Sequence, residues 1–150
     1  MKRQLNRILR IRELIEDLSR IDFEGKAAEV RHLELSAERQ RRLALDMRAA
    51  ALRILTAKEP VEREAWLMEI ADAEIFGWKE AKLEALAETR RPIVDGAREE
   101  LLDRRRDRLQ VEILHTDAVR EDEKCQIHRE QNRTDDWFQS QSERRDRKLD

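Results

Sequence analysis

The sequence is poor in the residues that make turns and small cores. Its 150 residues include three glycines, two prolines, one cysteine and no tyrosine, and aromatic residues make up 4%. Tight turns depend on glycine and proline, so these numbers argue against a β-sheet fold or a domain with many loops. The single cysteine, Cys125, cannot form an internal disulfide, which fits a reducing compartment.

Long apolar runs are also absent. No stretch approaches the roughly 20 apolar residues that a membrane-spanning helix needs. Four arginines interrupt residues 1–12, where a secretion signal would carry an apolar segment. We therefore expect a cytoplasmic protein. A net charge of -2 predicts no general attraction to nucleic acid or anionic lipid.

What the sequence has is charge, 44% of all residues, with apolar positions spaced for helices. A first stripe, with steps of three and four residues, holds Leu5, Ile8, Ile11, Ile15 and Leu18. The phase then slips by one residue at 22–25. A second stripe holds Val30, Leu33, Ala37, Gln40, Ala44, Met47, Ala51 and Ile54. Glu16 with Arg20, and Glu38 with Arg42, are expected to pair at i,i+4 on exposed faces.

Pro60 divides the chain into two helices, because proline cannot continue a helix but suits the first position of a new one. We expect helix one over about 3–57, a turn at about 57–60, helix two over about 61–138, and a frayed tail at 139–150. The predicted fold is all-α: a single antiparallel two-helix coiled-coil hairpin over residues 1–150, with a longer second helix.

A turn near residue 59 places position i opposite roughly 118 minus i. This arithmetic sets the slip at 22–25 against residues 92–96, which include Pro92, and predicts a kink shared by both helices. It also leaves helix two without a partner from about His115 onward. Such an overhang is expected to fray or to wait for a partner.

Catalytic and metal chemistry have little support. A hairpin encloses no cleft that would shift the pKa of a carboxylate, so we expect no enzyme and no cofactor. Cys125 and His128 offer two metal ligands where a structural zinc site needs four, so we expect no metal. Arginines 104–106 could touch phosphates, but Asp103 and Asp107 bracket them, and a solvated face is favoured.

The aromatic residues indicate protein contacts. Trp66, Phe76 and Trp78 follow the turn closely, and a two-helix hairpin cannot cover three rings, so they are a candidate binding patch. Packing across the hairpin tip, against Leu45 and Leu52, is an equal alternative. Two further aromatic residues, Trp137 and Phe138, lie near the C-terminal end of helix two, where helix one is not expected to reach. They are the predicted partner anchor.

The tail also carries a resemblance to a known family. Its charged segments are Glu123-Lys124, Arg129-Glu130-Gln131-Asn132-Arg133 and Asp135-Asp136-Trp137-Phe138. They resemble the C-terminal pattern of FliJ-type flagellar export proteins, which this chain also resembles in length and turn position. The resemblance implies a stalk of the type III export ATPase hexamer that also touches the export gate and export chaperones. It implies peripheral membrane association only through these partners.

The resemblance also implies contact surfaces. For the gate it implies a surface on both helices near the turn, where Leu45, Ala49 and Phe76 fit the family's pattern. Arg42, Asp72 and Lys79, elsewhere on that surface, depart from the pattern. For the ATPase it implies the tail together with the basic first turns, which hold Arg3, Arg7 and Arg10. The virulence-secretion stalk has the same architecture. A generic coiled-coil scaffold and, less favoured, a nucleic-acid-associated hairpin are the alternatives.

Overall fold

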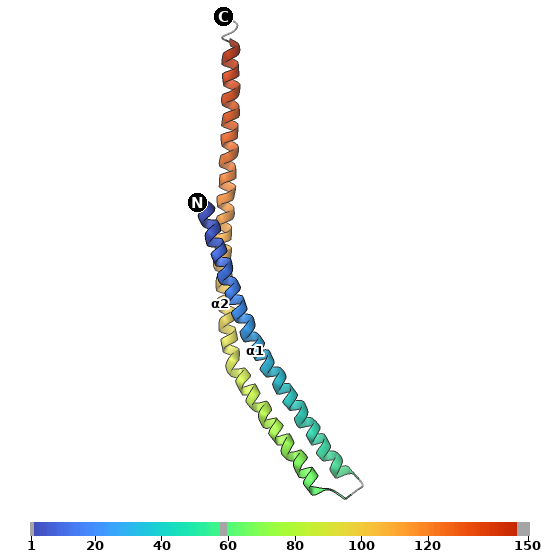
Figure 1. Cartoon of the computed structure of the whole chain (residues 1–150). Helices are drawn as coiled ribbons and strands as arrows, with labels where there is room; N and C mark the ends of the chain where they lie inside the picture. Colours follow the sequence, from blue (N-terminus) through green and yellow to red (C-terminus); the bar gives the residue numbers. More distant parts are fainter. Residues whose placement is uncertain (1, 58–59, 147–150) are drawn as a thin grey trace. The chain divides into compact units, whose positions relative to one another are not determined.

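The computed structural model describes residues 2–57 and 60–146, with side chains through residue 141. Helix α1 spans Lys2–Thr56 and helix α2 spans Arg63–Asp146 (Figure 1). The described residues contain no strand. The two helices pack against each other in opposite directions and the second is longer, so the predicted all-α hairpin is confirmed.

The helix ends differ from the predicted ones mainly at α2. Helix α1 closes where the Ala57 N–H donates to the Arg53 carbonyl at 3.0 Å. In α2 the Trp66 N–H donates to the Glu62 carbonyl at 3.1 Å, and the helix begins at Arg63. Pro60 therefore lies in the connection, as the expected turn at 57–60 has it, and is not the first residue of α2.

At its other end α2 continues to Asp146, beyond the expected limit near residue 138. The part of the expected tail at 139–146 is thus helical. Residues 147–150 of that tail, and residues 58–59 of the expected turn, lie outside the described residues.

The chain forms two compact units. One comprises residues 17–103, which hold most of α1, the connection and the first part of α2. The other comprises residues 2–16 of α1 with α2 from Arg104 onward. Each unit contains segments of both helices, running in opposite directions.

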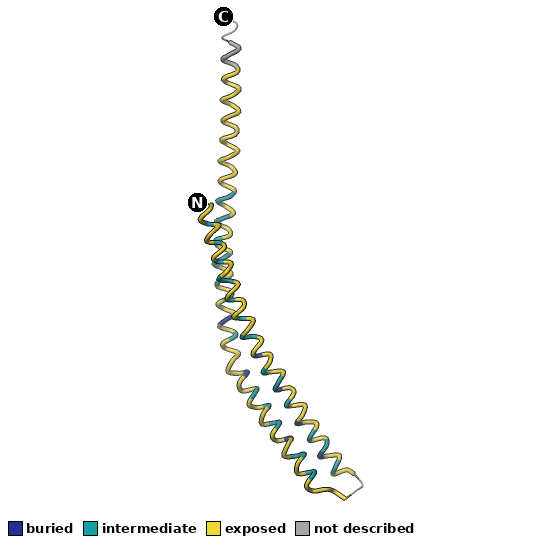
Figure 2. Tube along the Cα trace, viewed as in Figure 1, coloured by how far each residue is buried: buried dark blue, intermediate teal, exposed yellow. Residues whose placement is uncertain are grey.

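The core of the unit at 17–103 is built mainly from alanine. In α1 the buried residues recur every seven positions: Val30, Ala37, Ala44 and Ala51. In α2 they are Ala73, Ala87 and Ala97. Side chains this small let the backbones of two helices approach closely, because interaxial distance follows the size of the contact residues. Leu33, Gln40, Met47 and Ile54 are half-buried between them, which confirms the predicted second stripe (Figure 2).

The predicted phase slip at 22–25 is wrong. Upstream of Val30 the half-buried series continues with steps of three and four: Leu5, Leu9, Arg12, Glu16, Ser19, Phe23 and Lys26. Three residues predicted to form the seam, Ile8, Ile11 and Leu18, are 43%, 57% and 67% exposed. An unbroken helix keeps one phase, so the buried alanine series determines which face of the earlier turns is covered.

Ion pairs make this phase possible in the unit that holds residues 2–16. Glu16 accepts a hydrogen bond from Arg108 at 2.5 Å, and Asp107 accepts one from Arg12 at 2.9 Å. The Glu16 and Arg108 side chains are only 16% and 21% exposed, and their hydrogen bond raises the pKa of Arg108. Glu16 thus pairs across the helices. Arg20, its expected partner, binds Asp17 instead.

The pair expected at Glu38 and Arg42 does form, at 3.1 Å. The two outcomes have one cause. Glu38 is exposed and pairs with Arg42 one turn away on its own helix, whereas Glu16 lies in the seam and faces the opposite helix.

At each interhelical ion pair found among the described residues, the partner on α2 lies later in the sequence than the position predicted as 118 minus i. Arg12 pairs with Asp107, close to the expected position 106, but Lys2 pairs with Asp122 at 3.8 Å where 116 was expected. Glu34 pairs with Arg91 at 3.0 Å. Two causes account for this difference. Helix α2 begins at Arg63, later than assumed, which moves each partner to a higher residue number. Long charged side chains also reach along the helices, so paired residues need not lie directly opposite each other.

Two further expectations follow from that register. The unaccompanied part of α2 was expected from His115, but partial burial continues to Val119 and pairing to Asp122, so that limit is wrong. Both helices are unbroken at Gly25 and Pro92. The shared kink at these positions stays a prediction.

The Glu16–Arg108 pair gives a stability test. Replacing Arg108 with Met leaves the Glu16 carboxylate partly buried without its partner, and should lower the free energy of unfolding by about 1–3 kcal/mol. Replacing both residues with Leu should recover that loss, because two leucines form an apolar seam pair. Urea unfolding followed by circular dichroism measures both values.

The matched control is Arg20→Met, which removes an exposed pair with Asp17 and should change the free energy of unfolding by less than about 0.5 kcal/mol. Equal losses in the Arg108 single and the double-leucine variants would contradict a seam position for this pair.

Candidate partner-binding surfaces

The tip of the hairpin, in the unit at 17–103, carries an apolar surface on α1. Leu45, Ala49 and Leu52 are all exposed, Leu45 by 53% and Leu52 by 61%. They are spaced by four and three residues, so they share one face of α1. Ala44 and Ala51, each directly before a member of this set, lie in the buried seam. The three residues therefore form a stripe beside the covered face.

The three aromatic residues of the tip are not brought together as one patch. Trp66 and Phe76 are half-buried on the seam face of α2, whereas Trp78 is 65% exposed. The Lys82 ammonium lies 4.2 Å from the centre of the Trp78 ring, and that of Lys79 lies 5.4 Å from the Phe76 ring. Of these three residues, Trp78 is the most exposed.

The alternative prediction, that these rings pack across the hairpin tip against Leu45 and Leu52, is confirmed only in part. Trp66 and Phe76 do lie toward the opposite helix, as it expects. Leu45 and Leu52, its suggested partners, are exposed instead. The seam near the turn also holds two buried polar atoms without a hydrogen-bond partner among the described residues, Trp66 Nε1 and Glu69 Oε2. The sequence pattern gave no sign of Glu69.

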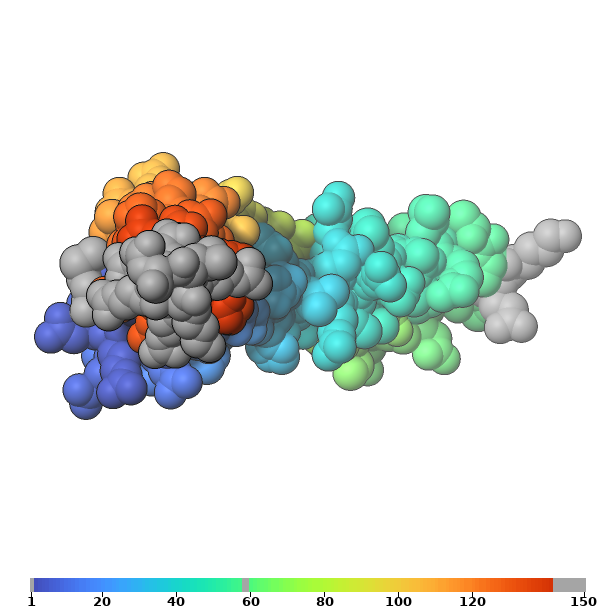
Figure 3. Space-filling view, turned by 90° about the horizontal axis from the view of Figure 1, so that it is seen from above, coloured from blue at the N-terminus to red at the C-terminus, as the bar shows by residue number. Residues whose placement is uncertain are grey.

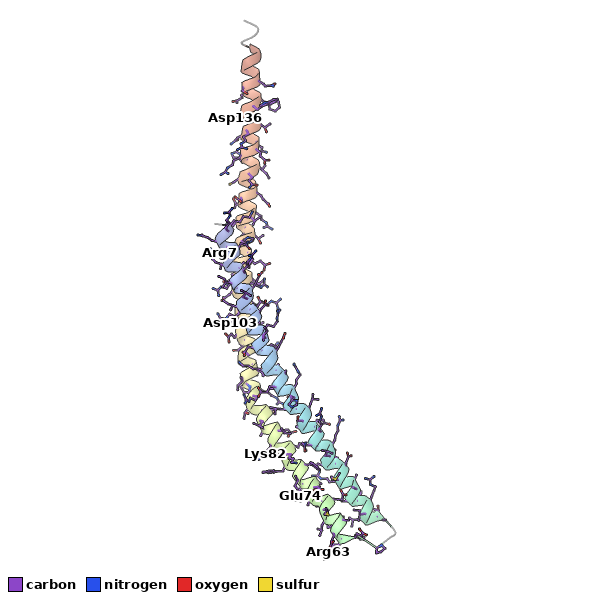
Figure 4. All side chains as sticks on the ribbon, in the orientation of Figure 1. Arg7, Arg63, Glu74, Lys82, Asp103 and Asp136 are labelled. Carbon is purple, nitrogen blue, oxygen red and sulfur yellow. The ribbon has the colours of Figure 1, made fainter. Side chains whose placement is uncertain are left out.

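The N-terminal arginines lie in the unit that combines residues 2–16 with the later part of α2. Figure 3 shows the N-terminal turns of α1 in blue at the surface. Arg3, Arg7 and Arg10 are exposed there (Arg7 is labelled in Figure 4), and no ion pair is found for them among the described residues. Arg12, which follows them, is held by Asp107. These three guanidinium groups give the first turns of α1 a positive surface available to acidic groups.

Beyond Asp122, α2 makes no ion pair with α1 among the described residues and lies unaccompanied. Every residue at 120–141 is exposed, although the helix continues through this stretch (Figures 2 and 4). The seam spacing that ends at Ala118 would continue through Asp122, Cys125, Arg129, Asn132 and Asp136, all polar or weakly apolar. The sequence therefore supplies no stripe for a second helix here, and the segment gains no burial within the chain.

The expected anchor lies on this segment. Trp137 and Phe138 are 54% and 60% exposed, and their ring centroids are 5.0 Å apart with planes at 77°. This edge-to-face arrangement orders the two rings on one another. Large exposed rings on a polar helix are typical of residues that become buried on binding.

One surface was missed by the sequence patterns. A groove in the unit at 17–103 has a floor of alanines, including Ala37, Ala81 and Ala87, and a rim of glutamates: Glu34, Glu38, Glu80, Glu84 and Glu88. Arg91 lies on the same rim and binds both Glu34 and Glu88, and these contacts raise its pKa. Glu38 pairs with Arg42 and Glu80 with Arg41, so four of the five rim carboxylates are paired within the chain.

Metal-binding groups do not gather in the part of the chain that the structure describes. Cys125 is exposed, and no group of three or more His, Cys, Asp and Glu side chains is placed to hold a metal ion among these residues. Within the same residues, neither helix has an apolar stretch long enough to cross a membrane.

Comparison of the chain with protein-family models, with curated proteins and with solved structures finds no match. The surfaces described above therefore rest on geometry and on the residue pattern alone.

The unaccompanied part of α2 predicts tolerance to truncation. A chain that ends after Val119 loses only exposed residues and three exposed ion pairs from the described structure: Lys2–Asp122, Asp117–Arg120 and Glu121–Lys124. Its thermal unfolding midpoint should stay within about 3 °C of the full-length value, because little apolar surface is lost from the core. Circular dichroism at 222 nm measures this; a fall of more than about 10 °C would show that residues beyond 119 stabilise the hairpin.

Proposed function

We propose that this protein is a non-enzymatic stalk of the flagellar type III export apparatus. In this role it occupies the ring of the export ATPase and links that ring to the export gate and to export chaperones. The observation that carries the proposal is the exposed helix at 120–141, which extends beyond the last ion pair with α1 and ends in the Trp137–Phe138 rings. A helix of this kind is marginal alone and is stabilised by a partner.

Charged surfaces support a contact with the ATPase. Arg3, Arg7 and Arg10 belong to the same compact unit as residues 120–141, so both expected contact regions lie in one body. Exposed charges steer association and set orientation, which a ring subunit with acidic groups could use. The proposed mechanism involves no chemistry on the stalk: asymmetric charged contacts favour ring assembly and couple ATP turnover to engagement of the gate.

Apolar surface near the turn supports a contact with the gate. Leu45, Ala49 and Leu52 form an exposed stripe on α1, and Trp78 on α2 is exposed as well. Phe76 contributes less, because it is half-buried toward α1. This surface is small, which suits a transient contact.

A generic coiled-coil scaffold is the second candidate, and a virulence-secretion stalk uses the same surfaces as the flagellar one. The same exposed helix and rings would serve any protein partner. Nucleic-acid binding is less favoured, since two of the three clustered arginines, Arg104 and Arg106, already interact within the chain.

The ATPase contact predicts a charge-dependent stimulation. Replacing Arg3, Arg7 and Arg10 with Ala should reduce stimulation of the purified export ATPase by at least about fivefold, because the steering charges are lost. The helical circular dichroism signal should be unchanged, since all three side chains are exposed and outside the seam.

The control replaces three exposed arginines of the other unit, Arg31, Arg39 and Arg48, with Ala, and should retain stimulation. Full stimulation by the N-terminal variant would contradict the assigned contact. Failure of the unmodified chain to bind the ATPase at all would leave the scaffold as the account of function.

A further inference from the structure

Helix α1 carries a second apolar stripe that the hairpin does not cover. Ile8, Ile11, Leu14, Leu18 and Ile21 are between 43% and 67% exposed. The seam toward α2 lies on a neighbouring face, through Leu9, Arg12 and Glu16. The first turns of α1 therefore place Arg12 and Glu16 in the seam beside Leu9, and leave the apolar side chains of this second stripe outside it.

The spacing of this stripe is that of a coiled-coil seam. Ile8, Ile11, Ile15 and Leu18 follow one another by three, four and three residues, and Leu14 and Ile21 broaden the same face. Ile15 is half-buried at the edge nearest to α2. Since α1 is one unbroken helix, this series forms a continuous stripe suited to one further helix.

The charges beside the stripe indicate which helix fits. Four charged residues recur at intervals of seven and therefore form one column along the edge of the stripe: Arg3, Arg10, Asp17 and Glu24. The column reads positive, positive, negative, negative. A helix with this column is complementary to itself when a second copy runs in the opposite direction.

We propose that this stripe binds the same stripe of a second copy of the chain, antiparallel and centred near Glu13. This arrangement places Arg10 opposite Asp17 and Arg3 opposite Glu24. The apolar residues match as well, with Ile8 opposite Leu18 and Ile11 opposite Ile15. A parallel arrangement would instead place like charges opposite each other, which is unfavourable.

The charges of the single chain permit this contact. Arg3, Arg10 and Glu24 are exposed, and none of them makes an ion pair within the described residues. Asp17 binds Arg20 on its own helix at 2.6 Å, with both side chains about half exposed. Such an exposed pair contributes little and is readily exchanged.

The stripe is short, so the dimer is weak. From Ile8 to Ile21 it measures about 20 Å at 1.5 Å per residue. A single helix face of this length buries less surface area than a standard protein interface. We expect a monomer–dimer equilibrium with a dissociation constant of order micromolar. Arg3 and Arg10 also belong to the proposed ATPase contact, so dimer formation and ATPase binding exclude each other. The self-association itself does not depend on the identity of that partner.

Sedimentation equilibrium of the full-length chain tests the apolar part of the contact. The unmodified chain should sediment as a concentration-dependent monomer–dimer mixture. Ile11→Ser should weaken the dimer at least about tenfold, as expected for one buried isoleucine of an interface. Ile127→Ser is the control, because Ile127 is exposed to the same extent, 56% against 57%, but lies on the unaccompanied part of α2.

Charge reversal tests the antiparallel arrangement. Arg10→Glu and Asp17→Arg should each weaken the dimer, since each places like charges opposite one another. The double variant Arg10→Glu with Asp17→Arg should restore dimer formation, and circular dichroism should show equal helix content in all four chains. The proposal is overturned if the chain is monomeric at all concentrations, if Ile127→Ser is the variant that dissociates the dimer, or if the double variant gives no recovery.

Discussion

The buried series Val30, Ala37, Ala44 and Ala51 determines how α1 faces its partner helix, because a continuous helix has a single phase. The other properties of the N-terminal turns depend on this constraint. Extended backward, the phase places Arg12 and Glu16 in the seam and requires ion partners for them, which Asp107 and Arg108 supply. The same phase turns Ile8, Ile11 and Leu18 toward solvent. Among the described residues, the buried apolar core thus lies in the unit at 17–103, whereas the seam of the other unit includes the charge pairs of Arg12 and Glu16.

Helix α2 is longer than α1, so one part of it packs against α1 and another part is exposed. Up to Asp122 its residues contact α1 in their own compact unit, and from there the helix continues with every described side chain exposed. Substitutions in a segment without intramolecular burial leave the packing of the core unchanged, so the sequence of this segment can be suited to a partner. This division supports the proposed stalk, in which the hairpin gives structure and the exposed segment, with Trp137 and Phe138, gives contact.

Much of the fold follows from the sequence. The scarcity of glycine and proline, the position of Pro60 and the stripe from Val30 to Ile54 predict the two helices, the connection and most of the core. The early seam could not be predicted from apolar spacing, because residues such as Arg12 and Glu16 are accepted only where the opposite helix offers ion partners. The exposed state of Trp137 and Phe138 was predictable from unequal helix lengths. The division of the tip aromatics was not, since it depends on which face of α2 each ring occupies.

The central claim is that the phase of α1 is continuous from its first turns to the alanine core. Thiol reactivity tests it in chains in which Cys125 is replaced by Ser and one cysteine is placed at either Leu9 or Ile11. At concentrations low enough to keep the chain monomeric, the account predicts slow modification at position 9, in the seam, and fast modification at position 11, where the native side chain is 57% exposed. Fast modification at position 9 and slow modification at position 11 would contradict the account, because that result requires the phase slip that the structure lacks.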